Sequence, residues 1–291
     1  MSKVILESIL SPENVQAAWK RLRRDRAPWA PGVSREELER TLPFHLTQLV
    51  EDLRSGRFRP EALRQYTAQK GDGEYRIISA QYLRDKLAQR LVHQCLDQEF
   101  DSLLHPDSFG FRRGRGVPHA VARLRERIAT GMFWLVDADI RSFFDRVPHS
   151  GLNRVLKRRI GDRRVRRLLQ QWMAIGAHRD SLLEQRRGLA QGMILSPLLC
   201  NLYLDRFDDQ MVRANIPFVR FADDFVLLAG DREAAQRAHD HAARTLARMG
   251  LELHPGKTRV CRASPAVAFL GKPVVRRRSR LHRRLVREGA S

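Results

Sequence analysis

Residues 218–228 read Phe-Val-Arg-Phe-Ala-Asp-Asp-Phe-Val-Leu-Leu, and Gly230-Asp231 follows shortly after. Aromatic and β-branched residues flank two adjacent carboxylates, Asp223 and Asp224, so the stretch predicts a short buried hairpin. A simple acidic turn is the alternative, but tight hairpin turns prefer Asn-Gly or Asp-Gly because positive φ is needed. Like charges beside apolar strands also repel each other unless a cation lies between them. Since Mg²⁺ binds a few carboxylate oxygens together with water and phosphate, we interpret the pair as half of a metal site.

A second acidic segment lies earlier in the chain, directly after an apolar run. Residues 133–136 are predicted to form a buried strand, and Asp137 and Asp139 follow at its carboxyl end. Because side chains alternate between the two faces of a strand, these aspartates share one face. An acidic strand end is ordinary, but one that lies five residues before the bulky Phe144 in a basic chain is less so. We therefore expect Asp139 to supply the third carboxylate.

The composition points to a polyanionic partner. The chain has 291 residues, with 54 Lys and Arg against 33 Asp and Glu, and a net charge of +21. This excess is spread along the length, which favours nucleic acid over an acidic membrane, since no amphipathic helix shows a clean apolar face. The three cysteines lack metal-binding spacing and predict buried, reduced thiols. No leader or run of ~18 apolar residues is found, so we expect a soluble, cytoplasmic protein without membrane contact.

Three segments carry residue patterns suited to phosphate. Lys70 and Arg76 flank a hairpin signal around residues 71–73, either as ordinary solvated charges or as a basic finger that clamps a phosphate-bearing ligand. Residues 108–116 interleave glycine and phenylalanine with three arginines, a pattern that suits backbone contact but that any arginine-rich turn could also produce. Residues 196–197 (Ser-Pro) suit a helix N-terminus, where free N–H groups favour phosphate.

Helices account for most of the remaining pattern. The sequence predicts several helices in residues 1–58, an amphipathic helix over 84–100, and a helical, intensely basic region over 151–187. A further helix over 233–249 ends at Gly250 as its C-terminal cap. Residues 251–258 then predict a strand and a turn that present Lys257.

Seven of these blocks, taken in order, resemble a reverse transcriptase of the group II intron-encoded branch and its bacterial relatives. They are residues 70–85, 108–112, 139–145, 191–192 with 196–197, 221–224, 250–258 and 269–271. The resemblance implies an α+β, right-hand polymerase in which an antiparallel palm sheet is backed by helices and the thumb is truncated. The expected parts are a helical N-terminal extension (1–58), fingers (59–131), a palm (132–271) with a helical finger insertion at about 151–190, and a basic thumb remnant (272–291).

The same resemblance implies RNA-directed DNA synthesis. The enzyme would add deoxynucleotides to a DNA or RNA primer on an RNA template, with two Mg²⁺ ions that Mn²⁺ can replace. It also implies a role for each matched residue. The metal ligands are Asp139, Asp223, Asp224 and the main-chain oxygen of Ile140, and Lys257 donates a proton to pyrophosphate. The triphosphate contacts are Lys70 and Arg76, the nucleotide pocket contains Gln191 and Gly192, and Phe144 excludes a 2′-hydroxyl. The implied nucleic-acid contacts are Arg112, Arg113, Arg115, Ser196, Phe269 and Gly271.

Departures from the family pattern narrow the biological context. Phe221 stands where these enzymes usually carry tyrosine, which keeps the ring and loses a hydroxyl. Pro197 argues against the diversity-generating branch. About twenty residues follow Gly271, so we expect a stand-alone domesticated enzyme, or one whose protein partner supplies the thumb or an integrase function, as in CRISPR-associated reverse transcriptases. The alternatives are a non-catalytic RNA-binding or maturase-like splicing cofactor, and an RNA-directed RNA polymerase, which Phe144 disfavours.

Overall fold

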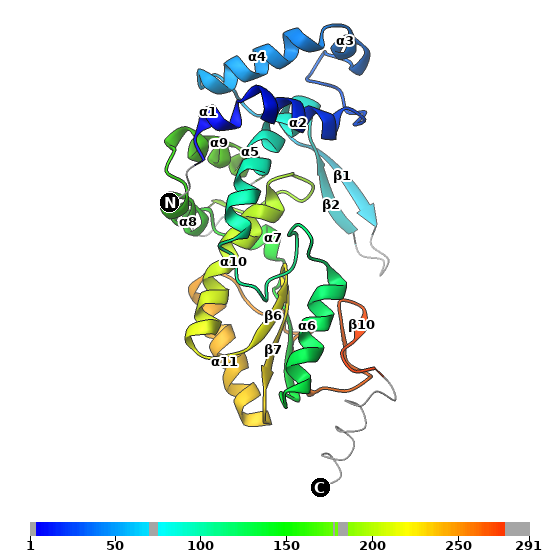
Figure 1. Ribbon diagram of the computed structural model, residues 1–291, viewed down its shortest axis with the longest axis vertical. Helices are drawn as coiled ribbons and strands as arrows, with labels where there is room; N and C mark the ends of the chain where they lie inside the picture. The colour runs from blue at the N-terminus through cyan, green and yellow to red at the C-terminus, as the bar shows by residue number, and fades with distance from the viewer. Residues whose placement is uncertain (1–3, 70–74, 177, 180–185, 277–291) are drawn as a thin grey trace. The chain divides into compact units, whose positions relative to one another are not determined.

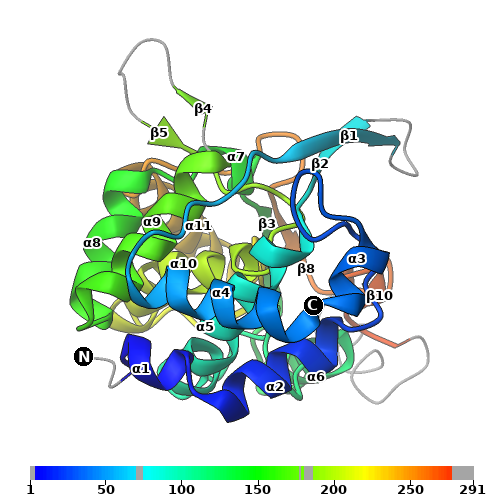
Figure 2. The same ribbon diagram turned by 90° about the horizontal axis from the view of Figure 1, so that it is seen from above.

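The computed structural model describes residues 4–69, 75–176, 178–179 and 186–276. The chain folds into two compact units, each made of two separate stretches. Unit 1 comprises Met1–Leu103 and Phe144–Leu199, and unit 2 comprises Leu104–Phe143 and Cys200–Ser291. Helices and antiparallel strands occur in both units (Figures 1 and 2), which confirms the predicted α+β class.

Unit 1 is mainly helical, as predicted for the N-terminal region and for residues 84–100. Its helices are α1 (Leu6–Ile9), α2 (Pro12–Leu22), α3 (Arg35–Arg40), α4 (Leu42–Arg54), α5 (Leu83–Asp101), α8 (His149–Arg159) and α9 (Arg163–Ile175). The hydroxyl of Ser34 accepts a hydrogen bond from the Glu37 N–H at 3.1 Å and caps α3. Such a cap satisfies one of the backbone donors that a helix start leaves without a partner.

Two hairpins complete unit 1 (Figure 2). Strands β1 (Arg64–Gln69) and β2 (Tyr75–Ala80) pair antiparallel, which confirms the predicted hairpin, although Lys70 and the hairpin tip lie outside the described residues. Of Arg76 the structure describes the backbone in β2. The second hairpin corrects a prediction, because the helical pattern expected over 151–187 ends at Ile175. Short strands β4 (His178–Arg179) and β5 (Arg186–Arg187) follow it.

A glycine pair explains why the helix stops where it does. Gly176 is the C-cap of α9, and a Cβ at this position would lie 2.7 Å from the Cβ of Ala190. Gly188, directly after β5, adopts a φ of +98°, which residues with a side chain rarely adopt. The returning chain is therefore packed too closely for a longer helix.

Unit 2 is built on a four-stranded antiparallel sheet with the strand order β6-β7-β3-β8. The strands are β3 (Trp134–Asp139), β6 (Phe218–Phe221), β7 (Asp224–Ala229) and β8 (Arg259–Arg262). The hairpin expected at residues 218–228 is confirmed as β6 and β7. Ala222 and Asp223 form its two-residue turn, and Ala222 takes the positive φ, +59°. The objection raised by an Asp-Asp turn does not apply, because Asp224 already lies in β7.

Helices cover both faces of this sheet (Figure 1). Helix α6 (Val117–Ala129) packs on one face, where a buried apolar cluster joins it to the strands. Helices α10 (Ser196–Arg213) and α11 (Arg232–Arg248) serve the other face, and the rings of Phe207 and Phe225 lie 4.8 Å apart there. The sheet is therefore held rigidly between layers, and its strand ends form the surface that matters for chemistry. Two minor strands, β9 (Ala268–Phe269) and β10 (Lys272–Pro273), form a separate small hairpin.

Three further observations bear on the sequence predictions. Residues 104–131, expected in the fingers, pack within unit 2, and the domain assignment itself stays a prediction. All three cysteines are free; Cys200 is buried, and Cys95 and Cys261 are half-buried. Across the described ranges of the chain, every helix is too short or too polar to span a bilayer.

Candidate active site

Two strand ends bring the predicted acids to one edge of the sheet. Asp139 is the last residue of β3 and stands directly opposite Asp224, the first residue of β7. Residues that face each other in an antiparallel ladder have Cβ atoms about 4.5–5.5 Å apart. Asp223 lies beside them in the turn between β6 and β7. The register therefore gathers all three carboxylates within unit 2.

The electrostatics of this edge disfavour three negative charges. Desolvation raises the pKa of Asp223, and the Asp139 carboxylate raises it further. Asp224 lies at the surface, yet desolvation of its carboxyl group and the charges of Asp223 and Asp139 raise its pKa to about 6. Carboxylates arranged in this way gain most from a hard divalent cation, whose charge offsets their repulsion.

A lysine offsets part of this charge in the free protein. The ammonium nitrogen of Lys257 lies 3.3 Å from Oδ2 of Asp139. Within the described ranges, no three His, Cys, Asp or Glu side chains are arranged so that they could hold a metal ion. The donor chemistry nevertheless fits Mg²⁺, since the register sets Asp139 opposite Asp224 and beside Asp223, and each carboxylate offers two oxygens.

The segment after α11 returns to β3 and fixes both Lys257 and Ile140. Leu253 forms an isolated bridge with Ile140, flanked by bonds from the Arg141 N–H to Glu252 O (3.0 Å) and from the His254 N–H to Asp139 O (2.8 Å). In such a pair Ile140 turns its own carbonyl away from Leu253, toward the β7 side of β3. The sequence predicted a strand and turn here, whereas the structure has this single bridge, a turn, and then β8.

Residues 68–274 match the family described as "Reverse transcriptase (RNA-dependent DNA polymerase)". The chain belongs to the reverse transcriptase family.

Relatives and solved structures agree with this assignment. Protein YkfC of Escherichia coli (strain K12) is 30% identical over 87% of this chain and 77% of that protein. The group II intron-encoded protein LtrA of Lactococcus lactis subsp. cremoris is 25% identical, over 73% of this chain but 36% of that protein. Telomerase from Candida albicans shares the fold, with a TM-score of 0.55, 14% identity, and coverage of 82% of this chain and 48% of that one. The right-hand polymerase fold and the group II-like branch are thereby confirmed.

In this reverse transcriptase, the three arginines of residues 108–116 differ in their surroundings: some bond within the loop and one is exposed. The guanidinium of Arg112 is buried and donates to the carbonyl oxygens of His105 (2.7 Å) and Ser108 (2.8 Å). Arg115 donates to the Pro106 carbonyl and lies over the Phe109 ring. Arg113 is exposed. Of the three predicted nucleic-acid contacts, Arg113 is thus the one placed for solvent, and Arg112 instead shapes the loop.

Burial also revises the roles predicted for Ser196 and Phe269. The Ser196 hydroxyl is buried and donates to the Ala190 carbonyl at 2.7 Å, so it closes the turn before α10. Phe269 belongs to the apolar cluster beneath α6, because its ring is excluded from water. Gly271 is exposed with a φ of +72°. A direct contact with nucleic acid is therefore open to Gly271 and closed to the side chains of the other two.

The predicted nucleotide-pocket residues belong to unit 1 of the reverse transcriptase. The backbone oxygen of Gln191 accepts a hydrogen bond from the Ser79 N–H at 3.0 Å, so the loop is tied to β2. Gly192 is exposed with a φ of +97°. The carbonyl of Phe144 accepts from the Leu189 N–H at 2.6 Å, and its ring is half-buried. Their roles toward a nucleotide stay predictions.

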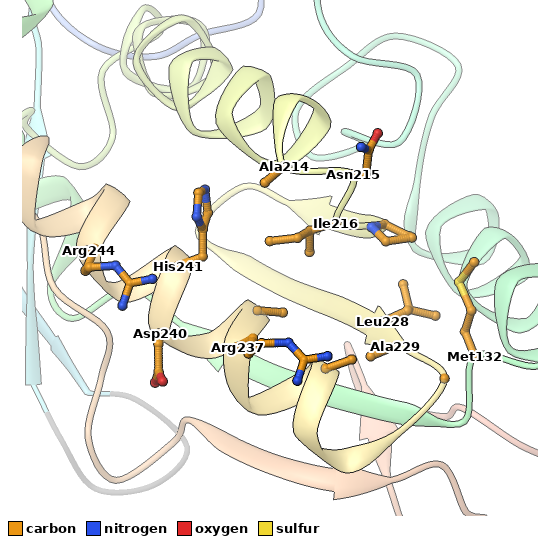
Figure 3. A pocket seen from close by; sticks show the side chains of 14 residues that line it. Met132, Ala214, Asn215, Ile216, Leu228, Ala229, Arg237, Asp240, His241 and Arg244 are labelled. Atoms are coloured by element: carbon orange, nitrogen blue, oxygen red, sulfur yellow. The ribbon is translucent and has the colours of Figure 1, made fainter.

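A cavity of about 660 Å³ lies at the other end of β7 from Asp224 (Figure 3). Leu228 and Ala229 contribute to its floor, and Arg237 and Arg244 of α11 line it. None of the residues predicted for catalysis lines this cavity.

Proposed function

We propose that this reverse transcriptase is a catalytically active RNA-directed DNA polymerase that extends a primer with deoxynucleotides. The observation that carries the proposal is the ladder register that sets Asp139 opposite Asp224 beside Asp223. Three neighbouring carboxylates, of which Asp223 and Asp224 have raised pKa values, serve no purpose in a protein that only binds a polyanion. They are suited to cations that accompany a nucleoside triphosphate.

Two Mg²⁺ ions, replaceable by Mn²⁺, are the proposed cofactors, held by the carboxylates of Asp139, Asp223 and Asp224 and the carbonyl of Ile140. When bound, such a pair activates the primer 3′-hydroxyl and neutralises the leaving pyrophosphate. The protein's own side chains bind the substrate and supply a proton. Lys257, an exposed ammonium beside Asp139, holds a proton for the pyrophosphate, while Lys70 and Arg76 contact the triphosphate.

Substrate choice is assigned to unit 1. We infer that Gln191 and Gly192 line the nucleotide pocket and that the ring of Phe144 leaves no room for a 2′-hydroxyl. Deoxynucleotides are then the substrates and RNA the template. The fingers, palm and thumb remnant named from the sequence remain proposed, as does a protein partner that supplies thumb or integrase function. Arg113 and Gly271 are the proposed surface contacts to nucleic acid.

Primer extension on an RNA template tests the proposal. Wild-type protein with Mg²⁺ should incorporate deoxynucleotides, and Asp223→Asn and Asp224→Asn should abolish incorporation while RNA binding persists. Asp137→Asn is the matched control, because Asp137 lies on the neighbouring strand β3 but pairs with Arg259 at 3.0 Å. Absence of template-dependent incorporation by the wild type, with RNA binding retained, would instead support the splicing-cofactor alternative.

A further inference from the structure

A fully buried arginine lies next to the acidic turn. Arg220 in β6 has a relative exposure of 0%. Its Nε and Nη2 donate to Oδ1 (2.7 Å) and Oδ2 (2.6 Å) of Asp208 in α10. Burial alone would lower the pKa of this guanidinium, but the Asp208 carboxylate raises it, so the guanidinium stays charged. This bidentate geometry is the strongest form of the arginine–carboxylate contact.

The third nitrogen of the guanidinium reaches the turn itself. Nη1 of Arg220 donates to the Ala222 carbonyl at 3.0 Å and to Oδ1 of Asn201 at 3.1 Å. The Asn201 amide in turn donates to the Gly110 carbonyl at 2.7 Å. A single planar group therefore connects α10 with the acidic turn and, through one amide, with the loop at Gly110.

The backbone of the same strand holds that loop a second time. The Arg220 N–H donates to Asp107 O at 2.9 Å, and its carbonyl accepts from the Phe109 N–H at 2.8 Å. Gly110 then packs so closely on Ala222 that an added Cβ would lie 2.3 Å from the Ala222 nitrogen. Loop and turn thus form one body, with Arg220 at its centre.

Stability alone does not require this arrangement. Buried ion pairs can often be replaced by apolar residues of similar volume with no loss of stability, or with a gain. The bond to the Ala222 carbonyl, in contrast, is directional and restrains a residue whose φ of +59° is uncommon outside glycine. Its effect is to set where the next two residues, Asp223 and Asp224, point.

We propose that Arg220, Asp208 and Asn201 are positioning residues that set the affinity of the acidic turn for divalent cations. The inference rests on the proposed function, because it assumes that the turn binds metal. It assigns these three residues no contact with substrate. Arg220 holds the Ala222 carbonyl directly, and Asp208 and Asn201 hold the guanidinium of Arg220 in place.

Binding of Mn²⁺ to the protein without nucleic acid tests the proposal, followed by the paramagnetic resonance signal of the free ion. In the double variant Arg220→Met/Asp208→Leu, the ion pair becomes two apolar side chains and the bond to the Ala222 carbonyl is lost. Thermal unfolding of the metal-free protein should change little, while Mn²⁺ affinity should fall ~10- to 100-fold, as for other groups that orient metal ligands. Half-maximal Mg²⁺ for primer extension should rise by the same factor.

Asn201→Ala gives an independent variant, since the Arg220–Asp208 pair stays intact while both amide bonds disappear. It should lower Mn²⁺ affinity ~10-fold, and it decides the question if the double variant does not fold. Arg237→Met in α11 is the matched control, because that exposed guanidinium reaches only Glu233, at 3.8 Å, among the ion pairs of the described residues. Its Mn²⁺ affinity should equal that of the wild type.

The outcomes separate the two proposals. Folded Arg220 and Asn201 variants that bind Mn²⁺ as tightly as the wild type, while Asp223→Asn does not, would overturn the positioning role and leave the metal site standing. Equal Mn²⁺ binding by the wild type and Asp223→Asn would overturn the metal site, and with it the positioning role.

Discussion

The ammonium group of Lys257 lies 3.3 Å from the Asp139 carboxylate, and its side chain is 65% exposed against 17% for Asp139. In the free protein the lysine therefore competes with any cation for one of the three proposed ligands. It is also free to swing toward solvent, where a triphosphate would arrive. The two roles can be separated by substitution.

Lys257→Met should raise Mn²⁺ affinity of the free protein modestly, by up to ~5-fold, since an exposed pair contributes at most about 1 kcal/mol. The same variant should slow nucleotide addition by ~10²-fold or more, because a positioned proton donor is lost. Lys257→Arg keeps the charge but holds its proton too tightly, so it should leave metal affinity unchanged and still slow synthesis. Single-turnover rates at saturating nucleotide measure nucleotide addition in both variants, and Mn²⁺ binding to the free protein measures their metal affinity. A wild-type rate for Lys257→Arg would exclude the proton-donor role.

Phe144→Ala should admit ribonucleotides. Loss of the ring removes the wall against a 2′-hydroxyl, and discrimination, measured as the ratio of kcat/KM for a deoxynucleotide and its ribonucleotide, should fall ~10²-fold. Phe44→Ala is the control, since that ring is 64% exposed in α4 and should not alter the ratio. Unchanged discrimination in Phe144→Ala would show that another residue selects the sugar.

Gly110→Ala should displace the acidic turn. A Cβ at Gly110 would lie 2.3 Å from the Ala222 nitrogen, so backbone must move at a cost of roughly 1–3 kcal/mol. Gly230→Ala, at the other end of β7, meets nothing within 4 Å and serves as control. Denaturant unfolding and primer extension should both report a defect for Gly110→Ala alone; wild-type activity in that variant would mean that the turn tolerates displacement.

Asp85→Asn should stabilise the protein at alkaline pH. Burial raises the pKa of Asp85 to about 7, so the folded state holds a proton that the unfolded chain releases near pH 4. The stability this provides is complete below that pH and is lost as the pH rises through 7. The free energy of unfolding of Asp85→Asn should therefore exceed that of the wild type at pH 8, by at most roughly 4 kcal/mol. The difference should become progressively smaller as the pH falls toward 4.

Asp162→Asn is the control, because the pKa of Asp162 is shifted in the opposite direction from that of Asp85. Burial alone would raise the pKa of Asp162, but hydrogen bonds from Arg164 and from the Leu6 N–H lower it overall. Its stabilising charge is present throughout pH 5–8, so Asp162→Asn should be destabilised equally at both ends of that range. Urea midpoints at pH 5 and pH 8 compare the two variants, and parallel behaviour would contradict the assigned pKa shifts.

The sequence predicted the acidic edge well because its signal is local. Alternation along residues 133–139 predicts that Asp137 and Asp139 share a face, and the apolar residues on both sides of Asp223 and Asp224 predict the hairpin. Helix α6 (Val117–Ala129) was not predicted, and the helical region expected over residues 151–187 was too long because a glycine's role depended on a distant contact. Gly176 ends α9 because Ala190 packs against it, and nothing between residues 163 and 176 records that approach.

Arg220 was missed for a related reason. In a chain with 54 Lys and Arg, one more arginine between apolar residues resembles a strand-edge cation, and its burial depends on Asp208 in another element. Arg112 shows the converse error. Its setting among glycines suggested phosphate contact, yet the loop's own carbonyls, which lack regular ladder partners, accept its donors.

The interleaved composition of the two units has a consequence for the order of events on the ribosome. Strand β3 leaves the exit tunnel well before its neighbours β7 and β8 have been translated, and both of its edges need those partners. Unit 2 therefore cannot close until synthesis has passed residue 262, and the nascent chain must carry an unpaired apolar strand in the meantime. Slow translation of residues 140–262 would prolong this interval.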